Sequence, residues 1–170
     1  MGDKKTTPPV PSPDASLAPA ASGGAQPPAV ATGAPFVDAG PGTLANKPGE
    51  PPLKMALSVN KIEFKCADDR KPVSIQMQLH NPTANKASFK VRCTSADIFR
   101  VQPPIGCVKP NETVTIVIWY QNRDSLATVN KNHYFAFYHT RADARTAREV
   151  WSVNVKADGV RRIPVIFTPK

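Results

Sequence analysis

Histidines and cysteines are the side chains of this 170-residue chain whose types could support metal or nucleophilic chemistry. There are three of each: His80, His133 and His139, and Cys66, Cys93 and Cys107. His133 and His139 are six residues apart, which places both on one face of a regular strand. A metal site needs further ligands, and no metal-binding Cys or His spacing accompanies this pair. We therefore expect no metal site and no cofactor.

Other catalytic signatures are also missing from the sequence. Cys66 or Cys107 with a histidine could form a nucleophile and its base, but no family signature surrounds either cysteine. After residue 52 the only glycines are Gly106 and Gly159, which excludes a glycine-rich phosphate loop there. No pair of acidic residues has a recognisable catalytic context. The sequence thus predicts a protein that is not an enzyme.

The composition divides the chain at residue 52. Residues 1–52 contain twelve prolines, ten alanines and seven glycines, with Phe36 as their one aromatic side chain. Such a segment buries too little apolar surface to offset the entropy lost on ordering. We expect a disordered arm over residues 1–52 and a globular domain over residues 53–170.

The sequence contains neither a membrane-spanning segment nor a secretory signal. No apolar run is long enough to span a membrane, and the N-terminus lacks the apolar core of a secretory signal. The missing targeting signals and the odd number of cysteines predict reduced thiols and a cytoplasmic location.

Residues 53–170 carry 19 Lys and Arg against nine Asp and Glu, a net charge of +10. That charge favours acidic partners or simply solubility, and no nucleic-acid readout motif accompanies it.

Short alternating segments predict an all-β domain. Residues 73–80 and 89–94 alternate apolar and polar side chains, and the turn residues between them predict an antiparallel pair. Residues 113–120 are apolar on both faces, as expected of a buried strand. Further strands are predicted at 57–64, 99–101, 134–140 and 160–168, with an edge strand or bridge at 151–155 and a marginal helix at 141–150. About seven strands at such spacing indicate an immunoglobulin-like antiparallel sandwich.

Strand alternation also predicts a basic surface. In the segment 89–94, Phe89, Val91 and Cys93 face inward, so Lys90 and Arg92 share the outward face. The predicted pairing would place Gln76 and Gln78 beside them. In the segment 134–140, either the tyrosines or the phenylalanines must face outward.

The domain resembles the major sperm protein (MSP) domain family over residues 56–168. The resemblance is carried by the segments 57–64, 80–83, 89–94, 105–110, 148–151 and 158–166. It implies a seven-stranded immunoglobulin-like sandwich. In this family, sperm-type domains assemble into filaments that drive amoeboid crawling, and membrane-anchored VAP adaptors bind acidic FFAT peptides on a basic face.

The resemblance also implies partners and contact residues. Lys90, Arg92 and Thr94 match the basic face of the adaptors, and His133 and Phe135 replace a lysine and a methionine of that face. A proline- and alanine-rich arm before the domain resembles the accessory MSP fibre proteins of nematode sperm. The expected function is to bind MSP filaments or other MSP-domain proteins and modulate their assembly or bundling in the sperm cytoskeleton and pseudopod. The alternative is a soluble VAP-like adaptor for acidic FFAT-type peptides.

Overall fold

The computed structural model describes residues 36, 44–67, 69–123, 132–152 and 154–170. All of them belong to the unit formed by residues 33–170. The arm's predicted disorder over residues 1–35 and 37–43 therefore lies outside the described residues.

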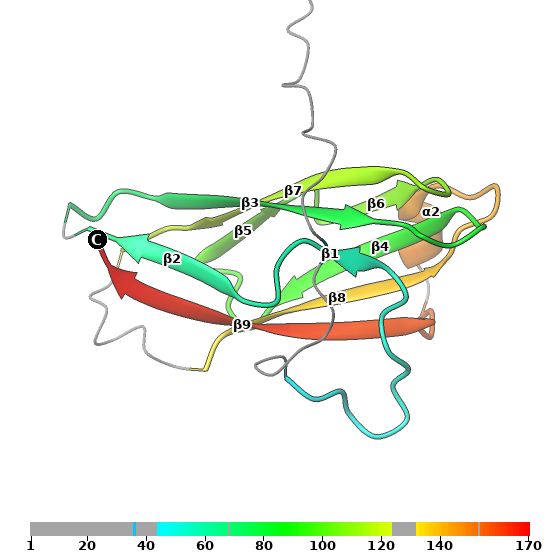
Figure 1. Cartoon of the computed structure of the whole chain (residues 1–170), viewed down its shortest axis with the longest axis horizontal. Helices are drawn as coiled ribbons and strands as arrows, with labels where there is room; N and C mark the ends of the chain where they lie inside the picture. The colour runs from blue at the N-terminus through cyan, green and yellow to red at the C-terminus, as the bar shows by residue number, and fades with distance from the viewer. Residues whose placement is uncertain (1–35, 37–43, 68, 124–131, 153) are drawn as a thin grey trace, which may run out of the picture. The chain divides into compact units, whose positions relative to one another are not determined.

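Two β-sheets pack face to face, as Figure 1 shows. The four-stranded sheet has the order β1-β3-β7-β5 and the five-stranded sheet the order β2-β9-β8-β4-β6. The first consists of β1 (Ala56–Leu57), β3 (Val73–His80), β7 (Thr113–Tyr120) and β5 (Phe99–Gln102). The second consists of β2 (Ile62–Cys66), β9 (Gly159–Pro169), β8 (Tyr134–Arg141), β4 (Ala87–Cys93) and β6 (Ile105–Val108). The predicted immunoglobulin-like sandwich is confirmed, although β2 and β9 pair in parallel.

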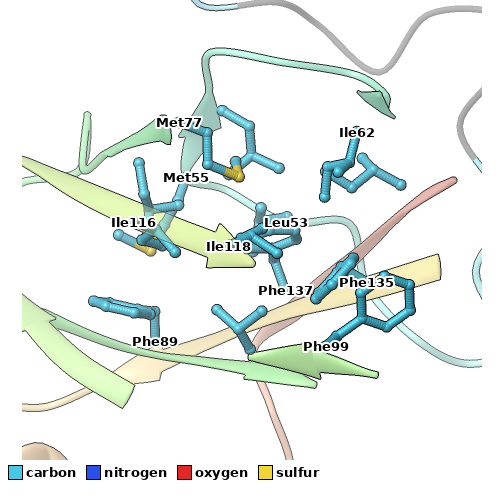
Figure 2. Close-up of a cluster of buried hydrophobic side chains, with 14 of the residues drawn as sticks. Leu53, Met55, Ile62, Met77, Phe89, Phe99, Ile116, Ile118, Phe135 and Phe137 are labelled. Atoms are coloured by element: carbon cyan, nitrogen blue, oxygen red, sulfur yellow. The ribbon is translucent and has the colours of Figure 1, made fainter. Parts of the chain in front are cut away.

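Aromatic and aliphatic side chains from both sheets form one core. Figure 2 shows Phe89, Phe135 and Phe137 of the five-stranded sheet near Ile116 and Ile118 of β7. All five side chains are almost fully buried. Alternation along the strands thus directs one apolar face of each sheet inward, which leaves the opposite face for contacts with other groups.

The predicted pairing of residues 73–80 with 89–94 is wrong. β3 pairs with β7 and β1, whereas β4 pairs with β8 and β6, so the connection crosses from one sheet to the other. The buried amide of Asn81 holds this crossing by donating to the carbonyl oxygens of Asn85 and Val108, at 2.9 and 3.0 Å. Gln76 and Gln78 consequently lie in the other sheet from Lys90 and Arg92.

Two further elements differ from the prediction. Residues 105–108 form strand β6, which the sequence analysis did not predict. The helix predicted over residues 141–150 is shorter and begins later, as α2 (Ala147–Trp151). Trp151 ends that helix, so the predicted edge strand at 151–155 does not begin there. Thr146 and Glu149 form a capping box that starts α2, and Val150 anchors it in the core.

Contacts with the domain begin before residue 53. Residues 44–52, assigned from composition to the arm, lie along β9, where Leu44 pairs with Arg162 and Pro52 pairs with Val160. The Leu44 amide donates to the Arg162 carbonyl at 3.1 Å, and the Asn46 side chain donates to the Val160 carbonyl at 2.9 Å. We call residues 44–52 the docked segment.

Candidate partner-binding face

The outward side of β4, β8 and β9 carries basic and aromatic side chains. The strand register places Lys90 opposite Tyr138 and Arg92 opposite Ala136, and Ala136 in turn lies opposite Arg162. Because paired residues project to the same side of a sheet, these side chains share one surface. We call this surface, defined by Lys90, Arg92, Tyr134, Tyr138 and Arg162, the basic face.

Helix α2 forms one wall of the basic face. The Trp151 indole donates through Nε1 to the Ser88 hydroxyl at 2.9 Å, which fixes the ring above β4. The Lys90 ammonium lies 5.5 Å from the centre of that ring, within the range of a cation–π contact. The tryptophan therefore holds the Lys90 cation near the sheet and leaves it partly exposed to solvent.

The docked segment forms the opposite wall. The Arg162 guanidinium is almost fully buried and makes a two-pronged ion pair with Glu50, including an Nη2–Oε1 contact of 2.9 Å. These hydrogen bonds lower the pKa of Glu50 to about 2, against the opposing effect of burial. Arg162 is thus neutralised within the chain, whereas neither Lys90 nor Arg92 forms an ion pair among the described residues.

A hollow of about 310 Å³ lies between these walls. Tyr138 and Val160 lie among its lining residues, and Lys90, Arg92 and Lys156 add three cations to them. Glu50 lines it too, with its charge already balanced by Arg162. Aromatic surface beside cations suits an extended peptide that brings carboxylates and apolar side chains.

Thr94 and His133 meet at the end of β4. Thr94 is exposed, and its hydroxyl lies 3.0 Å from Nδ1 of His133. The His133 ring is 8% exposed and makes an edge contact with Phe99. Thr94 can therefore contact a partner directly, whereas His133 supports Thr94 from beneath.

Phe135 does not belong to the basic face. Its side chain is fully buried, and its ring centre lies 5.0 Å from that of Phe99. Figure 2 shows the two rings side by side in the core. The outward aromatic pair on β8 is Tyr134 and Tyr138, both half-buried, whose hydroxyl-bearing rings suit a solvent-facing position. The structure thus places Lys90 and Arg92 together, with Thr94 at the strand end.

The sequence analysis does not identify several residues that line the hollow on the basic face. It predicts an edge strand or bridge from Trp151 and places Glu50 in the disordered arm. Lys156 carries no local pattern that distinguishes it from other surface lysines. For Tyr138, the sequence offered one indication: tyrosines and phenylalanines alternate in this segment, so one of the two pairs must face outward.

The histidines and cysteines do not form a cluster. His133 immediately precedes β8 and His139 lies toward the end of that strand. No group of three His, Cys, Asp or Glu side chains in the described part of the chain could hold a metal ion. All three cysteines are free. Burial raises the pKa of Cys66 and Cys93, which disfavours the reactive thiolate.

No described helix is long and apolar enough to cross a membrane.

Residues 57–157 match the family model of the MSP (major sperm protein) domain. The chain belongs to the MSP domain family. That match includes β4, β8 and α2 but ends before β9, and it excludes the docked segment. MSP domains are typically non-catalytic modules.

Relatives and solved structures agree with this membership. An uncharacterized Caenorhabditis elegans protein, R05D3.5, is 58% identical to this chain over an alignment of 154 positions. The match covers 78% of this chain and 86% of the relative. Solved C. elegans structures of SSP-19, an MSP-domain-like family member, and WR4, an MSP family member, share the fold. They are 22% and 11% identical, with TM-scores of 0.55 and 0.56. The matches cover 66% and 68% of this chain and 97% and 98% of those chains.

Proposed function

We propose that this MSP-domain protein is a non-enzymatic accessory protein of the MSP cytoskeleton. It binds MSP filaments through the basic face and modulates their assembly or bundling in amoeboid sperm. The observation that carries the proposal is the open hollow beside Lys90 and Arg92, two cations without an ion-pair partner among the described residues. Membership of the MSP domain family supports filaments as the partner.

The partner segment is expected to be acidic. Lys90, Arg92 and Lys156 offer three positive charges around one hollow, and the nearby carboxylate of Glu50 is committed to Arg162. Complementary charge speeds the encounter and fixes orientation, while aromatic surface supplies buried contact area. Binding is expected to weaken as ionic strength rises, because salt screens exposed charges.

A second candidate function uses the same face. The hollow between Trp151 and the docked segment has room for an acidic FFAT-type peptide, as in a soluble VAP-like adaptor. Against it, Phe135 is buried in the core, so its side chain supplies no contact for such a peptide.

Co-sedimentation with purified MSP filaments tests the two candidates against each other. We expect the full chain to pellet with filaments at physiological salt and to remain in the supernatant without them. An acidic FFAT-type peptide titrated in parallel should bind weakly or not at all. Low-micromolar peptide binding, about −8 kcal/mol, without any co-sedimentation would overturn the accessory function in favour of the adaptor.

A further inference from the structure

A second cavity, of about 540 Å³, lies beside the basic face at one end of the sandwich. The turn between β3 and β4, the end of β8 and the residues just before β9 enclose it. Pro51, Lys156 and Ala157 line both hollows, so the two are neighbours. Apart from the shared Lys156, this second cavity plays no part in the proposed function above.

The lining of this cavity is strongly basic. Its cations are Lys54, Lys86, Arg141 and Lys156. Lys54, Arg141 and Lys156 are exposed, while Lys86 is half-buried and donates through Nζ to the Arg145 carbonyl at 3.0 Å. Arg141 also pairs with Asp143 through its Nε. Four cations reach this cavity from four separate segments of the chain.

One acidic side chain lines the cavity, and its role is structural. Asp158 Oδ2 accepts from the Thr140 hydroxyl at 3.0 Å and from the Arg141 amide at 2.9 Å. These bonds tie the segment before β9 to the end of β8. The carboxylate therefore shapes the wall. With Arg141 paired to Asp143 and the charge of Asp158 counted, the positive charge of the cavity comes from Lys54, Lys86 and Lys156.

A buried histidine adds an unmet hydrogen-bonding group. The His139 ring is 4% exposed and lines the cavity, and its Nδ1 has no hydrogen-bond partner in the described structure. Burial lowers the pKa of His139 and Lys54 adds to this effect, while the nearby carboxylate of Asp158 and a weak contact with the Gly159 backbone oppose it. A buried polar atom without a partner is unusual in folded proteins and marks a place where a ligand could supply one.

We propose that this cavity is a binding site for a phosphomonoester group. A phosphomonoester carries close to two negative charges near neutral pH and presents three acceptor oxygens, which suits several converging cations better than a single carboxylate does. A cavity of this volume has room for the phosphate and part of the group that bears it. The phosphate could come from a phosphorylated serine or threonine or from a small phosphate ester, which share this chemistry.

Titration of the full chain with inorganic phosphate, O-phosphoserine and adenosine monophosphate, followed by NMR of the histidine rings, tests the proposal. We expect the His139 resonances to move with saturation at millimolar concentrations, while those of His80 stay in place. The pKa of His139 should rise when phosphate is bound, because an anion offsets the surrounding charges of Lys54, Lys86, Arg141 and Lys156. Tighter binding of phosphoserine would identify a phosphorylated protein segment as the source, and tighter binding of the nucleotide would identify a small ester.

Charge-removing variants complete the test. The double variant Lys54→Gln/Lys86→Gln should weaken phosphate binding at least tenfold, whereas Lys65→Gln/Lys71→Gln, the same charge change elsewhere, should not. The double variant Lys90→Glu/Arg92→Glu should also retain phosphate binding, which separates this site from the basic face. His139 resonances that do not respond to phosphate, or equal binding by the cavity variant and its control, would overturn the proposal.

Discussion

Glu50 and Arg162 are 112 residues apart in the sequence, yet their ion pair joins the docked segment to β9. Arg162 is 5% exposed, so its charge depends on Glu50 for compensation. Removing one partner of a buried ion pair leaves the other charge without compensation, which costs more than the pair itself contributes. This pair is therefore where a single substitution should most affect the docked segment.

We expect Glu50→Gln to lower the free energy of unfolding by about 3 kcal/mol, since the neutral amide cannot balance Arg162. Urea denaturation near pH 7 measures this change. Glu63→Gln is the matched control, because the half-buried Glu63 faces the exposed Lys61 at 3.7 Å. Its one hydrogen bond, from the Thr168 hydroxyl, can be kept by the glutamine carbonyl, so we expect a change within about 0.5 kcal/mol. Equal stability of the two variants would contradict the role given to this pair.

The same pair predicts a pH dependence. The pKa of Glu50 is lowered to about 2 in the folded chain from an ordinary value near 4.5, so the folded state favours the carboxylate. Its contribution to stability is present above about pH 4.5 and is lost as the pH falls toward about 2. Urea midpoints of the wild-type chain and Glu50→Gln should therefore converge between these pH values. A constant difference down to pH 2 would show that Glu50 stabilises the chain by something other than its charge.

At the scale of elements, α2 is short and depends on its cap. The Thr146 side chain accepts from the Glu149 amide, and the Glu149 carboxylate accepts from the Thr146 amide at 2.7 Å. A helix of five residues has little stability of its own, so this box and the buried Val150 must hold it. Because α2 positions Trp151 beside Lys90, the cap also shapes the hollow on the basic face.

We expect Thr146→Ala to lower the free energy of unfolding by about 1 kcal/mol, the usual cost of losing an N-cap hydroxyl. Urea denaturation followed by tryptophan fluorescence measures this loss, and both Trp119 and Trp151 contribute to the signal. Thr146→Ser keeps the hydroxyl and should match the wild-type chain. If both variants lose the same stability, the methyl group of Thr146 matters and the cap does not.

The docked segment gives a prediction about truncation. Besides its ion pair, it receives a hydrogen bond at 2.9 Å from the Val160 amide to the Pro51 carbonyl. Deleting residues 1–52 removes these contacts, and we expect the thermal midpoint to fall by several degrees. Deleting residues 1–43 also removes the ring contact of the exposed Phe36 with His80, and should lower the midpoint much less. Equal midpoints for the two truncated chains would show that the docked segment does not stabilise the domain.

Alternation of side chains identifies strands better than it identifies their partners. The segments 73–80, 113–120 and 134–140 were predicted as strands from alternation or apolar content, and β3, β7 and β8 lie there. Alternation does not distinguish a hairpin from a connection that crosses between sheets. Here the buried Asn81 amide, which bonds to carbonyl groups near residues 85 and 108, favours the crossing.

Only those residues of the candidate site that follow from the alternation of side chains along one strand could be predicted from the sequence. Lys90 and Arg92 follow from the alternation of β4, and the structure places them outward. The sequence could not show which side of β8 faces outward, because its tyrosines and its phenylalanines occupy alternate positions and either pair could form the buried face. Trp151 and Glu50 reach the basic face through contacts with Ser88 and Arg162, which are far from them in sequence. No local pattern reports such contacts.

At the scale of the whole molecule, the net charge of +9 is less informative than its distribution. Arg162 is neutralised by Glu50, and Arg141 and Lys71 face Asp143 and Asp69. Lys90 and Arg92 lie two residues apart on one strand, have no ion-pair partner among the described residues, and flank a hollow with aromatic lining. A partner that recognises this chain by charge should therefore be sensitive to those two residues and indifferent to cations on the other sheet.

The apparent affinity for MSP filaments, measured by co-sedimentation over a range of salt concentrations, tests the central claim most directly. The wild-type chain should bind more weakly as salt rises, and Lys90→Glu/Arg92→Glu should lose at least tenfold in affinity at low salt and most of the salt dependence. Lys71→Glu/Arg100→Glu makes the same charge change around the four-stranded sheet and should bind like the wild-type chain. Filament binding by Lys90→Glu/Arg92→Glu that equals the wild type at every salt concentration would contradict the account.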